Sequence, residues 1–122
     1  MQVKQIKCFI GVTSLAVALQ FMPGDAQAFE CPNHFAAAQA AIDKVVGDMK
    51  GDMSKRMPKA DMAQVHMLLD DAKMLLAGAR HNHEKPQVRL DHARAIAKAD
   101  SARGYAAAAD MLHFKMMKMM KK

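Results

Sequence analysis

Apolar residues recur every three or four positions in the segment 33–57, which is the spacing of one face of an α-helix. Asn33 directly precedes this pattern and is predicted to cap the helix. Gly47 and Gly51 weaken the helix toward its end, and Pro58 is expected to lie beyond it. The apolar face consists of Phe35, Ala38, Ile42, Val45, Met49 and Met53.

A second helix is predicted to begin at residues 58–61 and to end in the bend His81-Asn82-His83. Asn82 tolerates the left-handed conformation that closes many helices, so it is the expected end of this one. Leucine, alanine and methionine dominate the segment, and all three favour helix. The apolar face consists of Met62, Val65, Leu69, Ala72, Leu76 and Ala79.

The C-terminal third of the chain predicts either two further helices or one continuous helix. Pro86 suits the first turn of a third helix, on which His92 shares the inward face with Ala99. Asp100 or Ser101 can cap a fourth helix, although the pattern also allows a helix that continues through residue 101. No segment alternates as a strand does, so the predicted fold is all-α, an up-down four-helix bundle or two packed helical hairpins. The apolar face of the last segment consists of Tyr105, Ala108, Ala109, Leu112, Met116 and Met119.

Residues 1–28 have the three parts of a secretory signal peptide. A short basic start is followed by the mostly apolar segment 8–22 and by small residues, which predicts cleavage before Phe29. The apolar segment is too short for a comfortable membrane span. Export to the periplasm is therefore expected, and residues 29–122 are predicted to form a single helical domain with a methionine- and lysine-rich tail at 114–122.

Charge and cysteine content narrow the range of partners. Removal of Lys4, Lys7 and Asp25 with the signal peptide lowers the formal charge from +6 to +5. This balance suits acidic partners or membrane surfaces and specifies no nucleic acid. Cys31 is the only cysteine after residue 28, so the alternatives are a reduced thiol, a disulfide that joins two copies of the chain, and a metal ligand.

The six histidines and 13 methionines carry most of the functional information. In an up-down four-helix arrangement, five of the histidines, Cys31 and the tail meet at one end, and His66 lies near the other. Neutral imidazole is the commonest biological metal ligand, and thioether sulfur selects Cu(I). The predicted ligands are His34, His83, His92 and His113, then His81 and Cys31, with Met116, Met117, Met119 and Met120 as a softer Cu(I) site.

The resulting hypothesis is an exported, non-catalytic copper-class metal buffer or carrier that exchanges its ion with a periplasmic delivery partner. Nickel and zinc are the alternative metals. The sequence contains no Cys-x-x-Cys-His motif for covalent haem, no glycine-rich phosphate loop and no nucleophile elbow, so no enzymatic activity is predicted.

Packing offers a plainer explanation for some of the same residues. His92 can hydrogen-bond a backbone carbonyl or Asp71, as buried polar groups normally do. The competing function is an interaction module whose methionine-lysine tail docks on a partner protein or an anionic membrane, with Cys31 linking a homodimer. The methionines that suit core filling are Met49, Met53, Met62 and Met119.

An exported helical chain of this size, with histidines beside its apolar faces, resembles the small periplasmic metal-binding four-helix-bundle proteins. The resemblance rests on residues 69–79 and 90–99 and on His66, His92 and His113. It implies two packed helical hairpins whose histidines bind several divalent ions, copper preferentially, for storage or buffering. The chain departs from that family by having only six histidines and by adding methionine and Cys31, which favours one or two mixed sites.

The chain also resembles the cytochrome b-type four-helix bundles of the same compartment. In those proteins, haem is held by a methionine near the start of the first helix and a histidine on the last. His113 matches the second role, whereas His34 would have to replace the methionine. Few aromatic residues are present to line a haem pocket.

Overall fold

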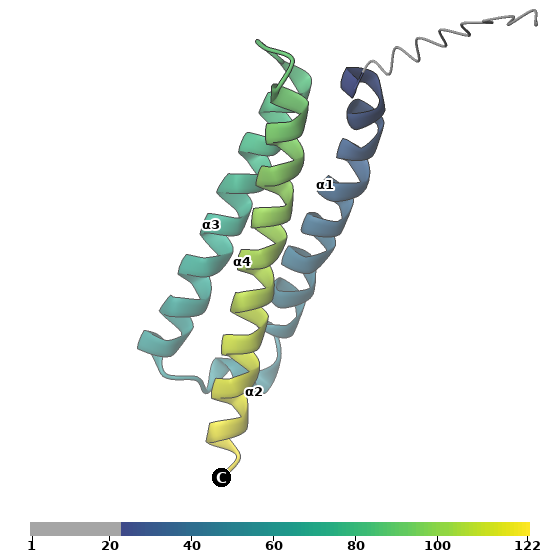
Figure 1. Ribbon diagram of the computed structural model, residues 1–122. Helices are drawn as coiled ribbons and strands as arrows, with labels where there is room; N and C mark the ends of the chain where they lie inside the picture. Colours follow the sequence, from purple (N-terminus) through teal and green to yellow (C-terminus); the bar gives the residue numbers. More distant parts are fainter. Residues whose placement is uncertain (1–22) are drawn as a thin grey trace, which may run out of the picture.

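Three long helices and one short helix form the structure, a computed structural model that describes residues 23–122 (Figure 1). The helices are α1 (Pro23–Asp48), α2 (Asp52–Lys55), α3 (Lys59–Glu84) and α4 (Asp91–Met120). The described residues form no β-strand and the long helices pack against one another, which confirms the predicted all-α bundle. Within the same part of the chain, no helix has both the length and the apolar character that a membrane span requires.

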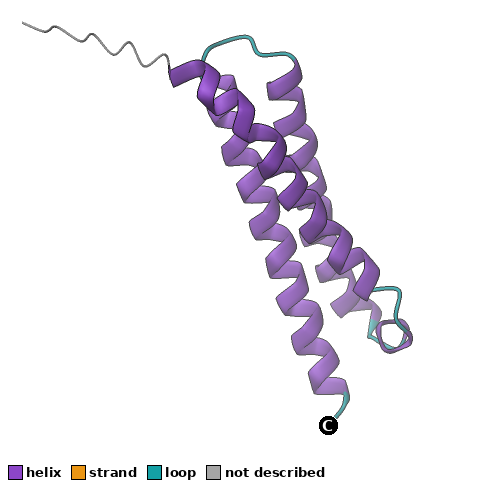
Figure 2. Cartoon of the chain, turned by 90° about the vertical axis from the view of Figure 1, so that its right-hand side faces the viewer, coloured by secondary structure: helices purple, strands orange, loops and turns teal. Residues whose placement is uncertain are grey.

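The long helices run alternately in opposite directions, so that the connections between successive helices lie at the two ends of the bundle. Figures 1 and 2 place the start of α1 and the loop between α3 and α4 at one end, which we call the loop end. The short helix α2 and the C-terminus lie at the other, which we call the α2 end. Helix α4 packs against both α1 and α3, and it therefore connects the whole bundle.

Helix α4 is continuous through residue 101, which decides between the two alternatives left open by the sequence. Ser101 does not cap a new helix; its hydroxyl donates a hydrogen bond of 2.8 Å to the carbonyl of Ala97, one turn earlier. The buried residues of α4 keep the same spacing of three or four positions before and after Ser101, so the packing is that of one uninterrupted helix. They are Ala95, Ala99, Ala102, Ala106, Ala109, His113 and Met116.

Several predicted helix ends are displaced. Helix α1 already contains Pro32 in its interior, so the prediction of Asn33 as its N-cap was wrong. Helix α3 begins at Lys59 as expected, but His81 and His83 belong to its last turn rather than to a bend. No non-glycine residue in the range 23–122 has a positive φ, so Asn82 is not in the left-handed conformation.

The carboxylate of Asp91 fixes the loop that precedes α4. One oxygen accepts hydrogen bonds from the backbone N–H groups of Gln87 (2.6 Å) and Val88 (3.0 Å), and the other accepts one from Arg94 (3.1 Å). These donors hold the pKa of Asp91 below its usual value, with the Val88 N–H as the largest cause. Because the backbone N–H groups of the loop donate to this carboxylate, the loop is held outside the helix, and α4 begins at Asp91 and not at Pro86.

The core is narrow and made largely of small or aliphatic residues. Met57 and Met116 are buried in it, and Met49 and Met62 pack partly buried against it. Met53 is only half-buried, and Met119 is 58% exposed, so the prediction that Met119 fills the core was wrong. The remaining buried apolar members of this cluster are Ala38, Ile42, Val45, Val65, Leu69, Ala72, Leu76, Ala102, Ala106 and Ala109.

The predicted signal peptide, 1–28, lies mostly outside the described residues, which begin at residue 23. Helix α1 includes residues on both sides of the predicted cleavage point before Phe29. Export and cleavage therefore stay predictions of the sequence.

Substitution of Ser101 by proline tests the continuity of α4. In the interior of a continuous helix, proline removes a backbone hydrogen bond and clashes with the preceding turn, at a cost of about 3 kcal/mol or more. We expect Ser101→Pro to lower the free energy of unfolding by this amount in urea titrations followed by circular dichroism. Ser101→Ala is the matched control and should be neutral or slightly stabilising.

The opposite outcome is well defined. If a new helix began at Asp100, residue 101 would occupy its first turn, where proline is favoured. A Ser101→Pro variant as stable as Ser101→Ala would therefore contradict a continuous α4.

Candidate metal centre

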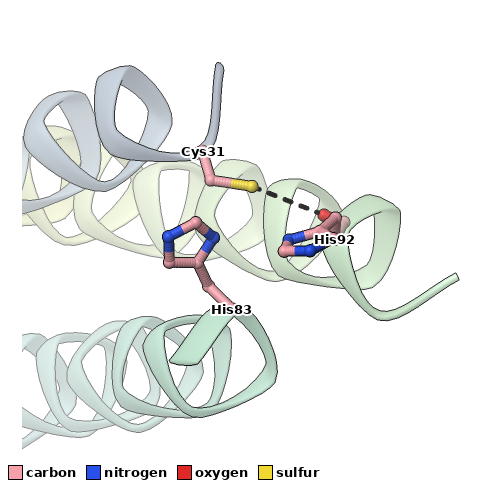
Figure 3. Close-up of side chains that lie close together, drawn as sticks. All are labelled: Cys31, His83 and His92. Atoms are coloured by element: carbon pink, nitrogen blue, oxygen red, sulfur yellow. Dashed lines mark hydrogen bonds between the residues drawn. The ribbon is translucent and has the colours of Figure 1, made fainter. Parts of the chain in front are cut away.

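Three helices bring Cys31, His83 and His92 together at the loop end (Figure 3). Cys31 lies on α1, His83 in the last turn of α3 and His92 in the first turn of α4. One ligand atom from each residue lies within 4.8 Å of those of the other two. Because the three residues come from three separate helices, the cluster is created by the tertiary fold and not by a local motif.

The thiol of Cys31 is fully buried between these helices. It donates a long hydrogen bond of 3.7 Å to the backbone carbonyl of His92, drawn as a dashed line in Figure 3. Burial raises the pKa of the thiol above its usual value, and the charge of Glu30 acts in the same direction. The thiol is therefore protonated at neutral pH until a cation replaces the proton. A disulfide between two copies of the chain would first require this side chain to be exposed.

The two imidazoles meet edge to face. Their ring centroids are 5.3 Å apart with an interplanar angle of 70°, and Phe35 packs against His83 in a similar way at 5.5 Å. The Nδ1 atoms of both histidines are buried and have no hydrogen-bond partner in the described part of the chain. Buried polar atoms are normally satisfied, so two such nitrogens beside a thiol are an unusual combination.

The chemistry of the three side chains limits which metal ions they can bind. Thiolate sulfur and imidazole nitrogen bind soft and borderline transition metals, chiefly copper and zinc. The cluster contains no carboxylate, and the neighbouring Asp91 is directed to the backbone of the loop. Magnesium and calcium would lack the oxygen ligands that they require.

His34 and His81 lie near the cluster in sequence but outside it. His34 is one turn after Cys31 on α1, and its Nδ1 is 2.8 Å from the carboxylate of Asp100 on α4. Through this contact, His34 joins α1 to α4. His81 is exposed on the surface of α3. Of the predicted histidine and cysteine ligands, the fold brings Cys31, His83 and His92 together as a possible metal-binding group in the described part of the chain.

His113 lies at the α2 end, so the predicted meeting of His113 and the tail with the other ligands was wrong. The reason is that α4 continues in one direction and does not return to the loop end. His113 is 4% exposed, and its Nε2 lies 2.7 Å from the hydroxyl of Ser54 on α2. When the Ser54 hydroxyl donates its single proton to the carbonyl of Asp48 (3.0 Å), the ring N–H of His113 is the donor to Ser54. His113 thus connects α4 to α2.

The methionines of the tail do not form one surface. Met116 is buried in the core, Met117 and Met120 are half-buried, and Met119 is largely exposed. The sulfur of Met117 is 4.0 Å from the Ser54 hydroxyl, which places it beside the His113 contact. Cu(I) capture by these methionines stays a prediction, and any such site would be separate from the cluster at the loop end.

Comparisons of the chain with protein-family models, curated proteins and solved structures found no match. The two resemblances seen in the sequence therefore depend on where the histidines behind each of them lie in the structure. A haem held between His34 and His113 is incompatible with the structure, because His34 contacts Asp100 in the first third of α4, whereas His113 contacts Ser54 at the α2 end. Of the histidines that suggested the periplasmic metal-binding bundles, His92 belongs to the cluster and His66 is exposed.

Removal of the Ser54 hydroxyl tests the structural role assigned to His113. In Ser54→Ala, the buried ring N–H loses its acceptor, and we expect a loss of about 1–3 kcal/mol in the free energy of unfolding. Ser101→Ala is the matched control, because it removes an exposed hydroxyl that is hydrogen-bonded within one helix. Equal stabilities of the two variants in chemical denaturation would show that the Ser54–His113 contact contributes nothing.

Proposed function

We propose that the protein is an exported, non-catalytic carrier or buffer for a copper-class metal ion, bound by Cys31, His83 and His92. The observation that carries the proposal is the approach of three strong ligands from three helices to within 4.8 Å, with both Nδ1 atoms buried and unpartnered. The signal-like pattern of residues 1–28 supports export, and the absence of catalytic motifs in the sequence supports a non-catalytic role.

Packing alone explains this cluster less well than a metal does. A histidine kept for structural reasons normally has a hydrogen-bond partner, as His34 has in Asp100 and His113 in Ser54. A buried polar atom without a partner costs about 1–3 kcal/mol. His83 and His92 would incur this cost side by side, and metal coordination through the two Nδ1 atoms would remove it for both.

Cu(I) is the ion that we place first. Thiolate and imidazole suit both Cu(I) and Zn(II), but zinc sites normally have four ligands and the cluster supplies three. Both imidazoles are half-buried as whole side chains, so exchange with a delivery protein would take place at the exposed side of the two rings. Zn(II) and Ni(II) are the competing ions, and they would need a further ligand from water or a partner.

Metal affinity is the direct test of this assignment. We expect Cys31→Ser, His83→Gln and His92→Gln each to weaken Cu(I) binding at least about 100-fold, which is about 2.7 kcal/mol. Competition with a chromophoric Cu(I) chelator measures this under reducing conditions. The matched controls are His81→Gln and His66→Gln, which alter exposed imidazoles and should leave the affinity unchanged.

Two outcomes would reject the proposed site. One is a wild-type affinity no greater than that of the triple variant lacking all three ligands. The other is an equal loss in the exposed-histidine controls, which would indicate nonspecific binding by surface imidazoles.

Bound metal should also stabilise the fold, because the ion would tie α1, α3 and α4 together at the loop end. With free metal at about 100 times the dissociation constant, linkage gives about 2.7 kcal/mol of added stability. For a domain of this size we expect an increase in Tm of roughly 10–20 °C in thermal scans by circular dichroism. Cys31→Ser should show no comparable increase at the same metal concentration, and a chelator should reverse the effect in the wild type.

A further inference from the structure

A lysine-edged apolar groove lies at the α2 end, remote from the metal ligands. It runs between the end of α1, the short helix α2 and one face of α3, and its volume is about 610 Å³. We call it the methionine groove, because Met49, Met57 and Met62 form much of its wall, together with Val46 and Leu69. Its cationic edge consists of Lys50, Lys55, Lys59 and Lys73.

The groove is positive and holds no negative charge of its own. None of its lining residues is an aspartate or a glutamate. Lys55 and Lys73 pair with Asp52 and Asp70, which are close neighbours on their own helices and do not line the groove. Lys50 and Lys59 form no ion pair with any residue in the range 23–122. Two cations at the edge of an apolar surface are therefore available to a negatively charged ligand.

We propose that the methionine groove binds an acidic amphipathic helix of a partner protein. Lys59, His66 and Lys73 follow one another along a single face of α3, two turns apart, and the groove extends over this whole stretch. The 15 residues from Lys59 to Lys73 span about 21 Å of helix, which matches a partner helix of about four turns. Apolar side chains of the partner would enter between the methionines, and its carboxylates would meet the lysines on both sides.

The methionine side chains suit this kind of recognition. Met49 and Met62 are half-buried, and their flexible thioethers can repack around side chains of different shapes. Met57 is buried beneath them and gives the groove an apolar floor. The half-buried methionines can thus adapt to the side chains of a partner, whereas the buried Met57 is held in place.

Charge and shape distinguish this occupant from others. A fatty acid carries one charge at one end, whereas the lysines of the groove lie at both ends of a stretch of 15 residues, from Lys59 to Lys73. A second copy of this chain is basic, with a formal charge of +6, and its α4 ends in further lysines. A flat anionic membrane would not reach the floor of a concave surface at which Met57 is only 6% exposed.

The test uses the full mature chain and a synthetic helical peptide of about 16 residues, long enough to cover the groove. The peptide has leucine at helical spacing and glutamate elsewhere, and a scrambled peptide of identical composition lacks the apolar face. Fluorescence anisotropy at low ionic strength should show saturable binding of the amphipathic peptide. We expect the double variant Lys50→Glu/Lys59→Glu to weaken binding at least about 10-fold, because it places repulsive charge beside the peptide.

The matched control is Lys85→Glu/Arg89→Glu, which changes the net charge equally at exposed positions near the loop end. This variant should retain most of the wild-type affinity, and Met62→Gln should lose affinity without any change in charge. Circular dichroism of each variant verifies that the helices are intact.

Four results would overturn the proposal. The first is the absence of saturable binding up to about 1 mM peptide, which is the weakest affinity worth assigning to a groove of this size. The second is equal binding of the scrambled peptide, and the third is an equal loss of affinity in the loop-end control. The fourth is binding to phosphatidylglycerol vesicles, in place of the peptide, that depends on Lys50 and Lys59. None of these measurements involves metal, so they are independent of the proposed copper site.

Discussion

The structure depends on the unbroken row of small residues along α4. Ala95, Ala99, Ala102, Ala106 and Ala109 are fully buried, and their small side chains allow both α1 and α3 to pack against this part of α4. A single rigid helix thereby fixes the two ends of the molecule relative to each other. It carries His92 at the loop end and His113 at the α2 end, which gives two histidines of one helix different surroundings and different roles.

The two ends differ in how their buried polar atoms are satisfied. At the α2 end, the Nε2 atom of the buried His113 has a protein partner in the hydroxyl of Ser54, which in turn donates to the carbonyl of Asp48. At the loop end, His83 and His92 each keep a buried nitrogen without a protein partner, next to the thiol of Cys31. Since an unpartnered buried nitrogen is costly, the loop end is the place where a bound ion would improve the fold. This contrast is the physical basis for proposing one metal site and one structural contact.

Much of the fold follows from the sequence, and the errors have specific causes. The sequence predicted that the second long helix begins within residues 58–61, where α3 begins at Lys59, and helical spacing predicted the inward direction of His92. It could not decide whether α4 breaks at Ser101, since serine both caps helices and tolerates an exposed position inside one. The predicted apolar face that includes Tyr105 was wrong, because Tyr105 is 40% exposed and the buried face of α4 consists mainly of alanines. The predicted start at Asn33 left Cys31 outside the first helix, although the same three- and four-residue spacing continues backward from Phe35 to Cys31.

The central claim is that one thiolate and two imidazoles from three helices bind a single metal ion. X-ray absorption spectroscopy of the copper-loaded protein tests it most directly, because it counts the ligand atoms around the metal. The account predicts one metal per chain, with one sulfur at about 2.2–2.3 Å and two nitrogens at about 2.0 Å, by analogy with known metal–thiolate and metal–imidazole distances. A first shell made only of nitrogen and oxygen, or one made of several sulfurs from methionine, would contradict it.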